Sequence, residues 1–541
     1  MCGICGELRF DGSPADTLAV ARMSDKIARR GPDHAGTLSD GSLAFGHRRL
    51  AIIDLTASAD QPMIDQELKL VLVFNGTIYN YKELRTELIA MGYRFFSESD
   101  SEVILKAYHA WGAQCVQRFF GMFALAVWDQ RDASLFMARD RFGIKPLYYS
   151  LDASRLRFAS TPQALLAAGG VDTRIDPVAL HHHFTLHAVV PAPRTILKGV
   201  RKLAPATTMT ISGSGQIEEA IYWKLDATRP AQPLSEAQWL AATRDVLLRA
   251  VERHRLAADV PVGVLLSGGL DSSLLVGLLA EHVDDLQTFS MGFETLGEGT
   301  EKADEFEFSD PVAKQFKTRH HKYLIPYDEV LRRLPEVVVQ MTEPMVSQDV
   351  IAFYLLGERV SKQVKVVLSG QGADEVFGGY FWYPRMDAAE GSALARFSAH
   401  YFLSGPRRVP RDGHTGLSFA RRPRRDCRAG GKSPGTAAGR HLHRSGAALR
   451  RHHAGGGRPR QARGQHGDGL GPGSARAIPE PRAVGTGGPD APGAQAQAGR
   501  PVPAQGDLPR FDFGRRDRPA ERLFSGAGAQ TRERRVPGLH A

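Results

Sequence analysis

The sequence predicts a layered α+β domain, then a parallel, doubly wound α/β domain, then a C-terminal region without regular structure. Residues 1–160 alternate short apolar runs with turn residues, which is typical of strands packed in layers. From about residue 235, strand-like and helix-like segments alternate, as in a parallel sheet with crossover helices. Beyond Tyr401 neither period continues, so we expect the ordered part to end near there.

The first domain, residues 1–160, contains segments with strand or helix spacing of apolar residues. The predicted strands are residues 43–53, 70–74, 122–128 and 134–138. The predicted helices lie near residues 17–29, 82–91 and 101–111. Residues 161–235 follow as a predicted connector, which carries the proline-rich segment 190–193.

The second domain is predicted over residues 236–403, where helices and strands alternate along the chain. The expected helices are residues 236–253, 272–281, 310–316 and 349–361. The expected strands are residues 260–266, 288–293, 321–325 and 364–368.

The net charge of +10 comes from the last part of the chain alone. From Tyr401 onward 26 Arg and 1 Lys stand against 10 acidic residues, whereas the preceding 400 residues carry 42 basic and 49 acidic ones. No Trp or Tyr follows Tyr401. Three interpretations of residues 404–541 follow: a basic nucleic-acid-binding tail, a disordered linker, or the product of GC-rich DNA translated in a wrong reading frame. We favour the frameshift, because lysine also serves phosphate binding and the excess of arginine has no evident purpose. No specific nucleic-acid partner is expected.

The expected location is the cytoplasm. No run of about 18 apolar residues is present, so no membrane span is expected. Met1 leads directly into Cys2, without the pattern of a signal peptide. Four cysteines are too few for a disulfide framework, which fits a reducing compartment.

Cys2 is the first candidate for catalysis. If Met1 is removed, the thiolate of Cys2 can attack an amide carbonyl, while its own α-amino group, with a pKa near ~8, moves the proton. One residue then supplies both nucleophile and base. Alternatively, Cys2 and Cys5 form a redox or metal-binding pair.

Eight ordered segments in the first 150 residues resemble the class II glutamine amidotransferases. The resemblance implies an N-terminal-nucleophile (Ntn) fold, in which two sheets are sandwiched between helices. The segments are Met1-Cys2-Gly3-Ile4, Arg30-Gly31-Pro32-Asp33, Gly46-His47-Arg48-Arg49-Leu50-Ala51-Ile52, Phe74-Asn75-Gly76, Ile78-Tyr79-Asn80, Ser99-Asp100-Ser101-Glu102, Gly121-Met122-Phe123-Ala124, and Arg139-Asp140 through Gly143-Ile144-Lys145-Pro146-Leu147-Tyr148-Tyr149.

The resemblance implies a role for five residues in glutamine hydrolysis. Cys2 is the expected nucleophile. The Asn75 side chain and the Gly76 backbone N–H are expected to form the oxyanion hole, which stabilises the charge of the tetrahedral intermediate. Arg49 is expected to bind the α-carboxylate of glutamine, and Asp100 its α-ammonium group.

A Gly/Ser turn follows the predicted strand 260–266 and opens a helix. Its glycines allow backbone N–H groups to approach phosphate oxygens, and the helix N-terminus favours negative charge. The turn lacks the lysine of a Walker A loop and resembles the PP-loop of ATP pyrophosphatases, which cleave ATP to AMP and pyrophosphate. A simple helix-capping turn is the alternative. The resemblance implies ATP binding by Leu266, Ser267, Gly268, Gly269, Asp271, Ser272, Ser273, Met291, Ser369 and Gly370.

A second segment, residues 368–380, resembles the asparagine synthetases and their relatives. Within it Asp374, together with Asp271, is expected to hold Mg²⁺, a hard cation that prefers oxygen ligands. Glu375 is a further expected residue of this site. The chemistry implied is activation of a carboxylate as an acyl-adenylate, which ammonia from the first domain then attacks.

The acceptor carboxylate is the open question. Thr77 and Gln371 stand where many family members have an acidic residue, and residues 301–310 and 342–347 also depart from ordinary asparagine synthetases. These departures resemble the branch that amidates N-acetylglutaminylglutamine, an acetylated dipeptide, to make an osmoprotectant. Aspartate is the alternative acceptor.

The family continues beyond residue 380 with a basic segment whose lysine meets pyrophosphate, whereas only Lys432 follows Tyr401 here. A glutaminase with an inactive synthetase, or a non-catalytic frameshift product, are therefore further alternatives. The oligomeric state stays open, with a homodimer as one option.

Overall fold

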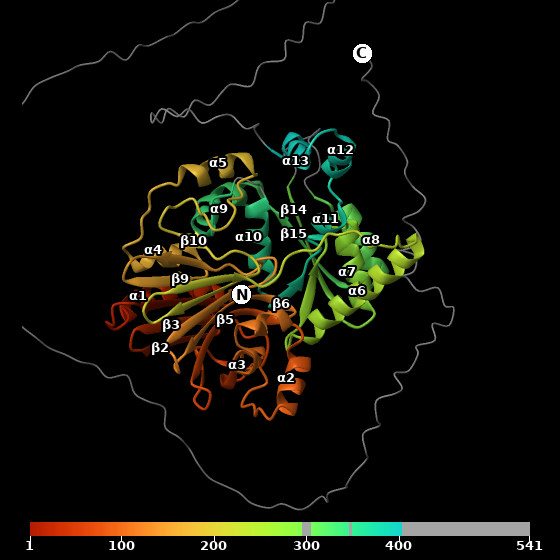
Figure 1. Cartoon of the computed structure of the whole chain (residues 1–541). Helices are drawn as coiled ribbons and strands as arrows, with labels where there is room; N and C mark the ends of the chain where they lie inside the picture. The colour runs from red at the N-terminus through yellow and green to blue at the C-terminus, as the bar shows by residue number, and fades with distance from the viewer. Residues whose placement is uncertain (295–303, 346–348, 403–541) are drawn as a thin grey trace, which may run out of the picture. The chain divides into compact units, whose positions relative to one another are not determined.

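Three sheets organise the computed structural model, which describes residues 1–294, 304–345 and 349–402 (Figure 1). Two are six-stranded and antiparallel, and the third has four parallel strands. All described residues belong to one compact unit. The predictions for residues 404–541 lie outside the described residues, as do residues 301–303 of the acidic segment and residues 346–347.

The first sheet contains the strand that follows Cys2. Its outer face is covered by two helices, α1 (Thr17–Lys26) and α4 (Pro162–Ala168), which pack on Cys5, Ala44 and Ala159. In spatial order its strands are β10 (Arg201–Lys202), β8 (Tyr148–Leu151), β9 (Arg155–Ala159), β1 (Gly3–Arg9), β3 (Leu43–Arg49) and β2 (His34–Asp40).

The second sheet carries the Asn-Gly pair and is covered by helices α2 (Tyr81–Ala90) and α3 (Asp100–Trp111). In spatial order its strands are β12 (Ile217–Ile221), β11 (Thr207–Ser212), β7 (Ser134–Arg139), β6 (Gly121–Asp129), β5 (Leu70–Ile78) and β4 (Met63–Asp65). Short 3₁₀ helices lie at Ala28–Arg30, Ala57–Ala59 and Gly112–Arg118.

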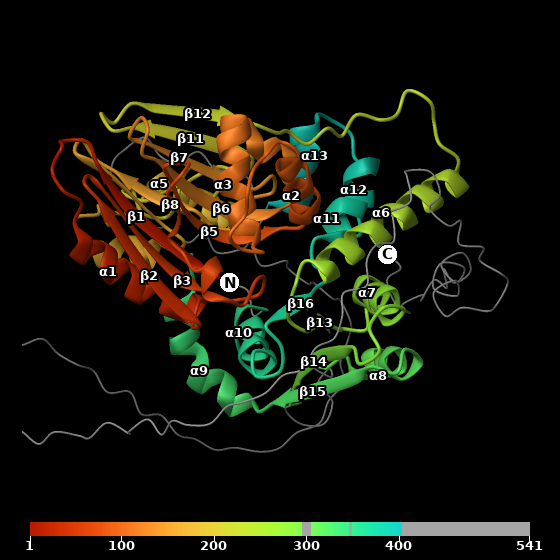
Figure 2. The same cartoon turned by 90° about the horizontal axis from the view of Figure 1, so that it is seen from below.

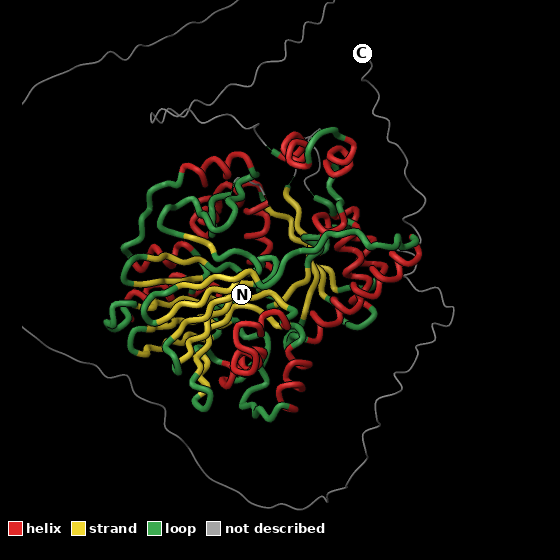
Figure 3. The backbone as a smooth tube through the Cα atoms, in the orientation of Figure 1, coloured by secondary structure: helices red, strands yellow, loops and turns green. Residues whose placement is uncertain are grey.

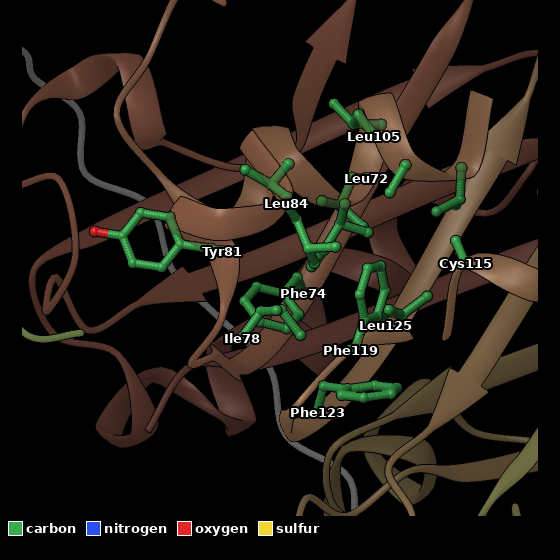
Figure 4. Packing of buried hydrophobic residues seen from close by; sticks show 14 of the residues in the cluster. Leu72, Phe74, Ile78, Tyr81, Leu84, Leu105, Cys115, Phe119, Phe123 and Leu125 are labelled. Carbon is green, nitrogen blue, oxygen red and sulfur yellow. The ribbon is translucent and has the colours of Figure 1, made fainter. Parts of the chain in front are cut away.

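Strand β5 shows how the layers form. Successive side chains of a strand point to opposite faces. Leu72 and Phe74 pack with α2 and α3 in the outer core (Figure 4), whereas Val71 and Val73 pack against the first sheet in the central core. Figure 3 shows the two sheets as layers with helices outside them. The predicted sandwich of two sheets between helices is thus confirmed.

The segment 161–235, expected as a connector, contributes strands to both sheets. β10 pairs with β8, and β11 pairs with β7 over five residues, Thr208–Ser212. Met209 and Ile211 of β11 are buried in the central core. The helix α5 (Pro177–Thr185) lies between α4 and β10 in the chain.

The third sheet has the order β15-β14-β13-β16, with all strands parallel (Figure 2). The chain runs outward from β13 to β15 and then returns to the other side of β13, so the order reverses between β13 and β16. Ligands of such sheets bind at the carboxyl ends of the strands where the order reverses. The strands are β13 (Val262–Leu265), β14 (Gln287–Phe293), β15 (Arg319–Ile325) and β16 (Val366–Leu368).

Eight helices accompany this sheet in the described ranges, and the predicted parallel, doubly wound domain is confirmed. Helix α9 was not predicted, because its internal Pro335 is a residue that usually breaks helices. None of the described helices is long and apolar enough to cross a membrane. The helices are α6 (Glu236–Leu256), α7 (Leu270–Ala280), α8 (Phe306–Gln315), α9 (Tyr327–Gln340), α10 (Asp349–Val360), α11 (Ala373–Phe377), α12 (Trp382–Ala388) and α13 (Ala393–Tyr401).

Candidate active sites

The thiol of Cys2 lies just before β1, half-buried, with two fixed neighbours. The Leu50 backbone N–H donates to Sγ at 3.3 Å, and Arg30 Nε donates to the Cys2 carbonyl oxygen at 3.0 Å. Burial raises the pKa of the Cys2 thiol, and the backbone hydrogen bond at Leu50 opposes that rise. Burial also lowers the pKa of the Met1 amino group to about 5, so this amine is uncharged at neutral pH.

Asn75 lies on β5, and neither polar atom of its side chain has a hydrogen-bond partner among the described residues. The residue is 0% exposed. Leaving a buried polar group unpaired costs about 1–3 kcal/mol, so such a group calls for an explanation such as a ligand. The amino terminus lies close to β5 in both cartoon views (Figures 1 and 2).

Gly76, the next residue, can only be glycine at this point of the sheet. A Cβ there would lie 2.3 Å from the carbonyl oxygen of Met122 on the neighbouring strand β6. The sheet therefore keeps the strand backbone next to Asn75 free of a side chain, as the expected oxyanion hole requires.

Asp100 begins helix α3 and is almost fully buried. Its Oδ2 accepts a hydrogen bond of 3.0 Å from the N–H of Ile78, the last residue of β5. Burial raises the pKa of Asp100 to about 7. The charges of Asp100 and Arg49 both act on the Cys2 thiol, with opposite effects on its pKa. The structure thus brings these three predicted residues into one electrostatic neighbourhood.

Arg49 ends β3 and is buried, but its guanidinium already has partners. Nη1 donates to the carbonyl of Thr56 at 2.8 Å and to Asp60 Oδ1 at 2.6 Å. Nη2 donates to the carbonyls of Ile53, at 3.4 Å, and Asp54. Arg49 therefore holds the loop that follows β3, and its role at the glutamine carboxylate stays a prediction.

Two cations near Cys2, the half-buried Arg30 and the buried Lys145, were given no role in the sequence analysis. Arg30 Nη2 has no hydrogen-bond partner among the described residues. Lys145 is 5% exposed, and burial together with the charge of Arg30 lowers its pKa to about 8. Both residues belong to segments that match the family, but a matching segment does not reveal which of its side chains faces the nucleophile.

The second candidate site is a cavity of about 970 Å³ at the carboxyl ends of the parallel strands. Ser273 lies outside its described lining, and the buried hydroxyl of Ser273 has no hydrogen-bond partner among the described residues. Glu375, also outside, accepts a hydrogen bond of 2.7 Å from the Tyr380 hydroxyl. Nine predicted residues line the cavity: Leu266, Ser267, Gly269, Asp271, Ser272, Met291, Ser369, Gly370 and Asp374.

The loop after β13 has the shape that its glycines predict. Gly268 adopts φ +86°, and a Cβ there would lie 2.5 Å from the backbone of Phe308. Ser267 Oγ lies 3.0 Å from Ser272 Oγ and accepts from the Gly269 N–H at 3.3 Å. The loop thus closes on the first turn of α7, where backbone N–H groups can meet phosphate oxygens.

Asp271 and Asp374 fit the predicted Mg²⁺. Burial and the charge of Asp374 raise the pKa of Asp271, so the two carboxylates lie close enough to interact. Mg²⁺ is usually held by one or two carboxylates together with phosphate oxygens and water. Within the described ranges, no group of three or more His, Cys, Asp or Glu side chains could hold a metal ion.

The first domain thus combines a half-buried thiol with a buried, unpaired amide, and the second has a glycine-rich loop at the switch point of a parallel sheet. These features are those of the class of two-domain glutamine amidotransferases. Residues 1–223 match the family described as "Glutamine amidotransferase domain", and residues 242–466 match "Asparagine synthase". The chain belongs to the glutamine-hydrolysing asparagine synthetase family.

Three curated relatives illustrate the similarity. "Asparagine synthetase [glutamine-hydrolyzing] 1" of Bacillus subtilis is 37% identical over 388 residues, which are 71% of this chain and 59% of that protein. A "Putative asparagine synthetase [glutamine-hydrolyzing]" of Mycobacterium bovis is 38% identical over 406 residues, 70% of this chain and 61% of that protein. "Putative asparagine synthetase [glutamine-hydrolyzing] 2" of Methanocaldococcus jannaschii is 35% identical over 403 residues, 70% of this chain and 76% of that protein. The chain spans about three fifths of the first two relatives.

We expect Asn75→Ala to lower kcat for glutamine hydrolysis by about 10²–10³, the usual effect of losing one oxyanion-hole donor. Because the amide has no partner among the residues that the structure describes, its loss should leave Tm nearly unchanged. Asn80→Ala is the matched control, since Asn80 bonds to the backbones of Arg118 and Phe120 and its loss should lower Tm. A wild-type kcat in Asn75→Ala would contradict this assignment.

We expect kcat/KM for glutamine to fall as the pH drops through about 7, where Asp100 takes up a proton and loses its attraction for the glutamine ammonium group. Lys145, with a pKa of about 8, titrates on the alkaline side of Asp100. Asp100→Asn should lower kcat/KM and abolish the inflection near pH 7. The same inflection in Asp100→Asn would assign it to another group.

Proposed function

We propose that the chain is a glutamine-dependent, ATP-consuming amidotransferase. The first domain hydrolyses glutamine to ammonia and glutamate, and the second activates a carboxylate as an acyl-adenylate that the ammonia converts to an amide. The observation that carries the proposal is the unpaired, fully buried amide of Asn75 on the strand that ends beside Asp100.

In the first domain, removal of Met1 gives Cys2 the free amino group that takes the thiol proton. The thiolate then attacks the glutamine amide carbon. Asn75 Nδ2 and the Gly76 N–H donate to the oxygen that becomes negative, a stabilisation of ~3–4 kcal/mol for one donor. Asp100 and Arg49 orient glutamine through its ammonium and carboxylate groups.

In the second domain, the loop after β13 and the first turn of α7 bind the phosphates of ATP, and Met291 lies where adenine is expected. Asp271 and Asp374 would hold Mg²⁺, which neutralises phosphate charge when bound. The backbone N–H groups of the loop orient the α-phosphate toward the acceptor carboxylate.

For the acceptor we favour N-acetylglutaminylglutamine, whose amide would act as an osmoprotectant, over aspartate. The support is the neutral Gln371 in the lining of the cavity, together with an apolar wall. This lining suits a longer, partly apolar acceptor better than a small doubly charged one. The apolar wall consists of Val330, Ile351, Phe353 and Leu356.

Aspartate stays the alternative acceptor, because the curated relatives named above are asparagine synthetases. A glutaminase with an inactive synthetase, or a non-catalytic frameshift product, is favoured by the single lysine after Tyr401. We place the protein in the cytoplasm, since a thiol nucleophile needs a reducing compartment.

The test of the first half is glutamine hydrolysis by the full chain. Cys2→Ala should reduce it to the background rate. Cys5→Ala, which replaces a fully buried thiol whose hydrogen bonds among the described residues go to the backbone carbonyls of Val20 and Gly46, should retain it. Undiminished hydrolysis by Cys2→Ala would exclude Cys2 as the nucleophile.

The test of the second half is pyrophosphate release with glutamine, ATP and Mg²⁺. We expect efficient hydrolysis of glutamine but little pyrophosphate from this chain, because the lysine expected to meet the leaving group is missing. A chain with the reading frame restored should release pyrophosphate with N-acetylglutaminylglutamine. Robust release of pyrophosphate by the unmodified chain would contradict the expected loss of synthetase activity. Release with aspartate but not with N-acetylglutaminylglutamine would identify aspartate as the acceptor.

A further inference from the structure

The strands β13 and β16 are neighbours in the parallel sheet. Their carboxyl ends and their amino ends lie at different sites. Their carboxyl ends carry the loops that line the predicted nucleotide cavity, which begin at Leu266 and Ser369. Their amino ends carry Asp259, three residues before β13, and Lys365, directly before β16. Both of these residues contact the loop that follows β3 in the first domain.

Lys365 is linked to the backbone next to the nucleophile by hydrogen bonds to Asp33 and Ala51. Its Nζ donates to Asp33 Oδ2 at 2.8 Å and to the Ala51 carbonyl at 3.4 Å. Asp33 Oδ2 also accepts from the Ala51 N–H at 2.8 Å. The adjacent Leu50 N–H is the donor to Cys2 Sγ. The position of that donor therefore depends on a side chain of the second domain.

Asp259 holds the other end of the same loop. Its Oδ2 accepts from the Asp54 N–H at 2.7 Å, and its N–H donates to the Ile52 carbonyl at 2.9 Å. Asp54 has a left-handed backbone (φ +50°), which an L side chain rarely adopts and which therefore needs support from its surroundings. The Asp54 carbonyl in turn accepts from Arg49.

We propose that Lys365 and Asp259 are positioning residues for glutamine hydrolysis, which hold the loop 50–54 so that its N–H meets the Cys2 thiol. The inference rests on the function proposed above and adds a physical link between the two sites. Because the same two strands bear the nucleotide loops, a displacement of either strand on ATP binding changes the support of the loop. Such coupling is reciprocal, so occupancy of the Cys2 site also affects ATP affinity.

The domains also meet at contacts that lie away from the loop 50–54. Glu343 accepts from the Tyr148 hydroxyl at 2.7 Å and from Lys202 Nζ at 2.8 Å, and Arg29 pairs with Glu336 at 3.3 Å. None of these groups bonds to the loop 50–54. They join the domains, whereas Lys365 and Asp259 join the second domain to the loop at the nucleophile.

The experiment compares Lys365→Ala with Lys365→Arg and with Lys362→Ala in the full chain. Lys362 is an exposed lysine three residues away and is the matched control. Three quantities are measured with and without ATP and Mg²⁺: kcat and KM for glutamine hydrolysis, Tm, and the rate at which iodoacetamide alkylates Cys2, followed by mass spectrometry of the Cys2 peptide.

We expect Lys365→Ala to lower kcat by about five- to tenfold, the range for a partly exposed charged hydrogen bond, with KM changed much less. Alkylation of Cys2 should slow, because the Leu50 N–H no longer stabilises the thiolate. ATP and Mg²⁺ should change the alkylation rate of the wild type but not that of Lys365→Ala. Lys365→Arg should restore most of kcat, and Lys362→Ala should match the wild type. Asp259→Asn, which keeps an acceptor oxygen, should be milder than Asp259→Ala.

If Lys365→Ala and Asp259→Ala equal Lys362→Ala in both kcat and alkylation, the proposal is wrong. If Lys365→Ala fails to fold, Lys365→Met gives the same comparison, because it keeps most of the side chain but removes the charged donor to Asp33 and Ala51. A wild-type chain without glutamine hydrolysis would overturn the proposed function, while the alkylation rates would still decide whether the second domain positions Cys2.

Discussion

The first domain depends on one strand, β5, which is buried on both faces. Its odd-numbered valines pack against the first sheet, and Leu72 and Phe74 pack against α2 and α3. This two-sided burial fixes the strand in register with β6 and so fixes the place of Asn75 and Gly76 at its end. The sandwich can thus hold an unpaired amide in its interior, an arrangement that costs stability and that a binding site explains.

The second domain positions its polar groups for a ligand in a different way, at the carboxyl ends of parallel strands. The strand order reverses between β13 and β16, and both loops at their carboxyl ends are rich in glycine. Asp271 and Asp374 both line the cavity there, and burial together with the charge of Asp374 raises the pKa of Asp271. A divalent cation bound with phosphate would remove the repulsion between the two carboxylates, which is why the site is ready for a charged ligand but not filled by protein groups.

The sequence analysis predicted the strands and helices whose structure follows from the spacing of their own apolar residues. Strands β5, β6 and β7 have strong apolar runs, and the alternation from α6 to β16 follows the expected order. Strand β3 ends at Arg49, four residues before the predicted end, because Leu50 and its neighbours turn toward Cys2 and are held there by distant groups. Contacts such as that of Lys365 with Asp33, which are 332 residues apart, leave no local pattern to detect. The partners of Arg49 were missed for the same reason, since a match to a family segment identifies a residue but not its contacts.

The central claim is that Cys2, with its own free amino group, is the nucleophile for glutamine. Intact and peptide mass spectrometry of the full chain after treatment with the glutamine analogue 6-diazo-5-oxonorleucine tests it most directly. We predict a single adduct on Cys2 in protein that has lost Met1, with protection by excess glutamine. An adduct on another residue, or adduct formation on Cys2 while Met1 is still present, would contradict the account.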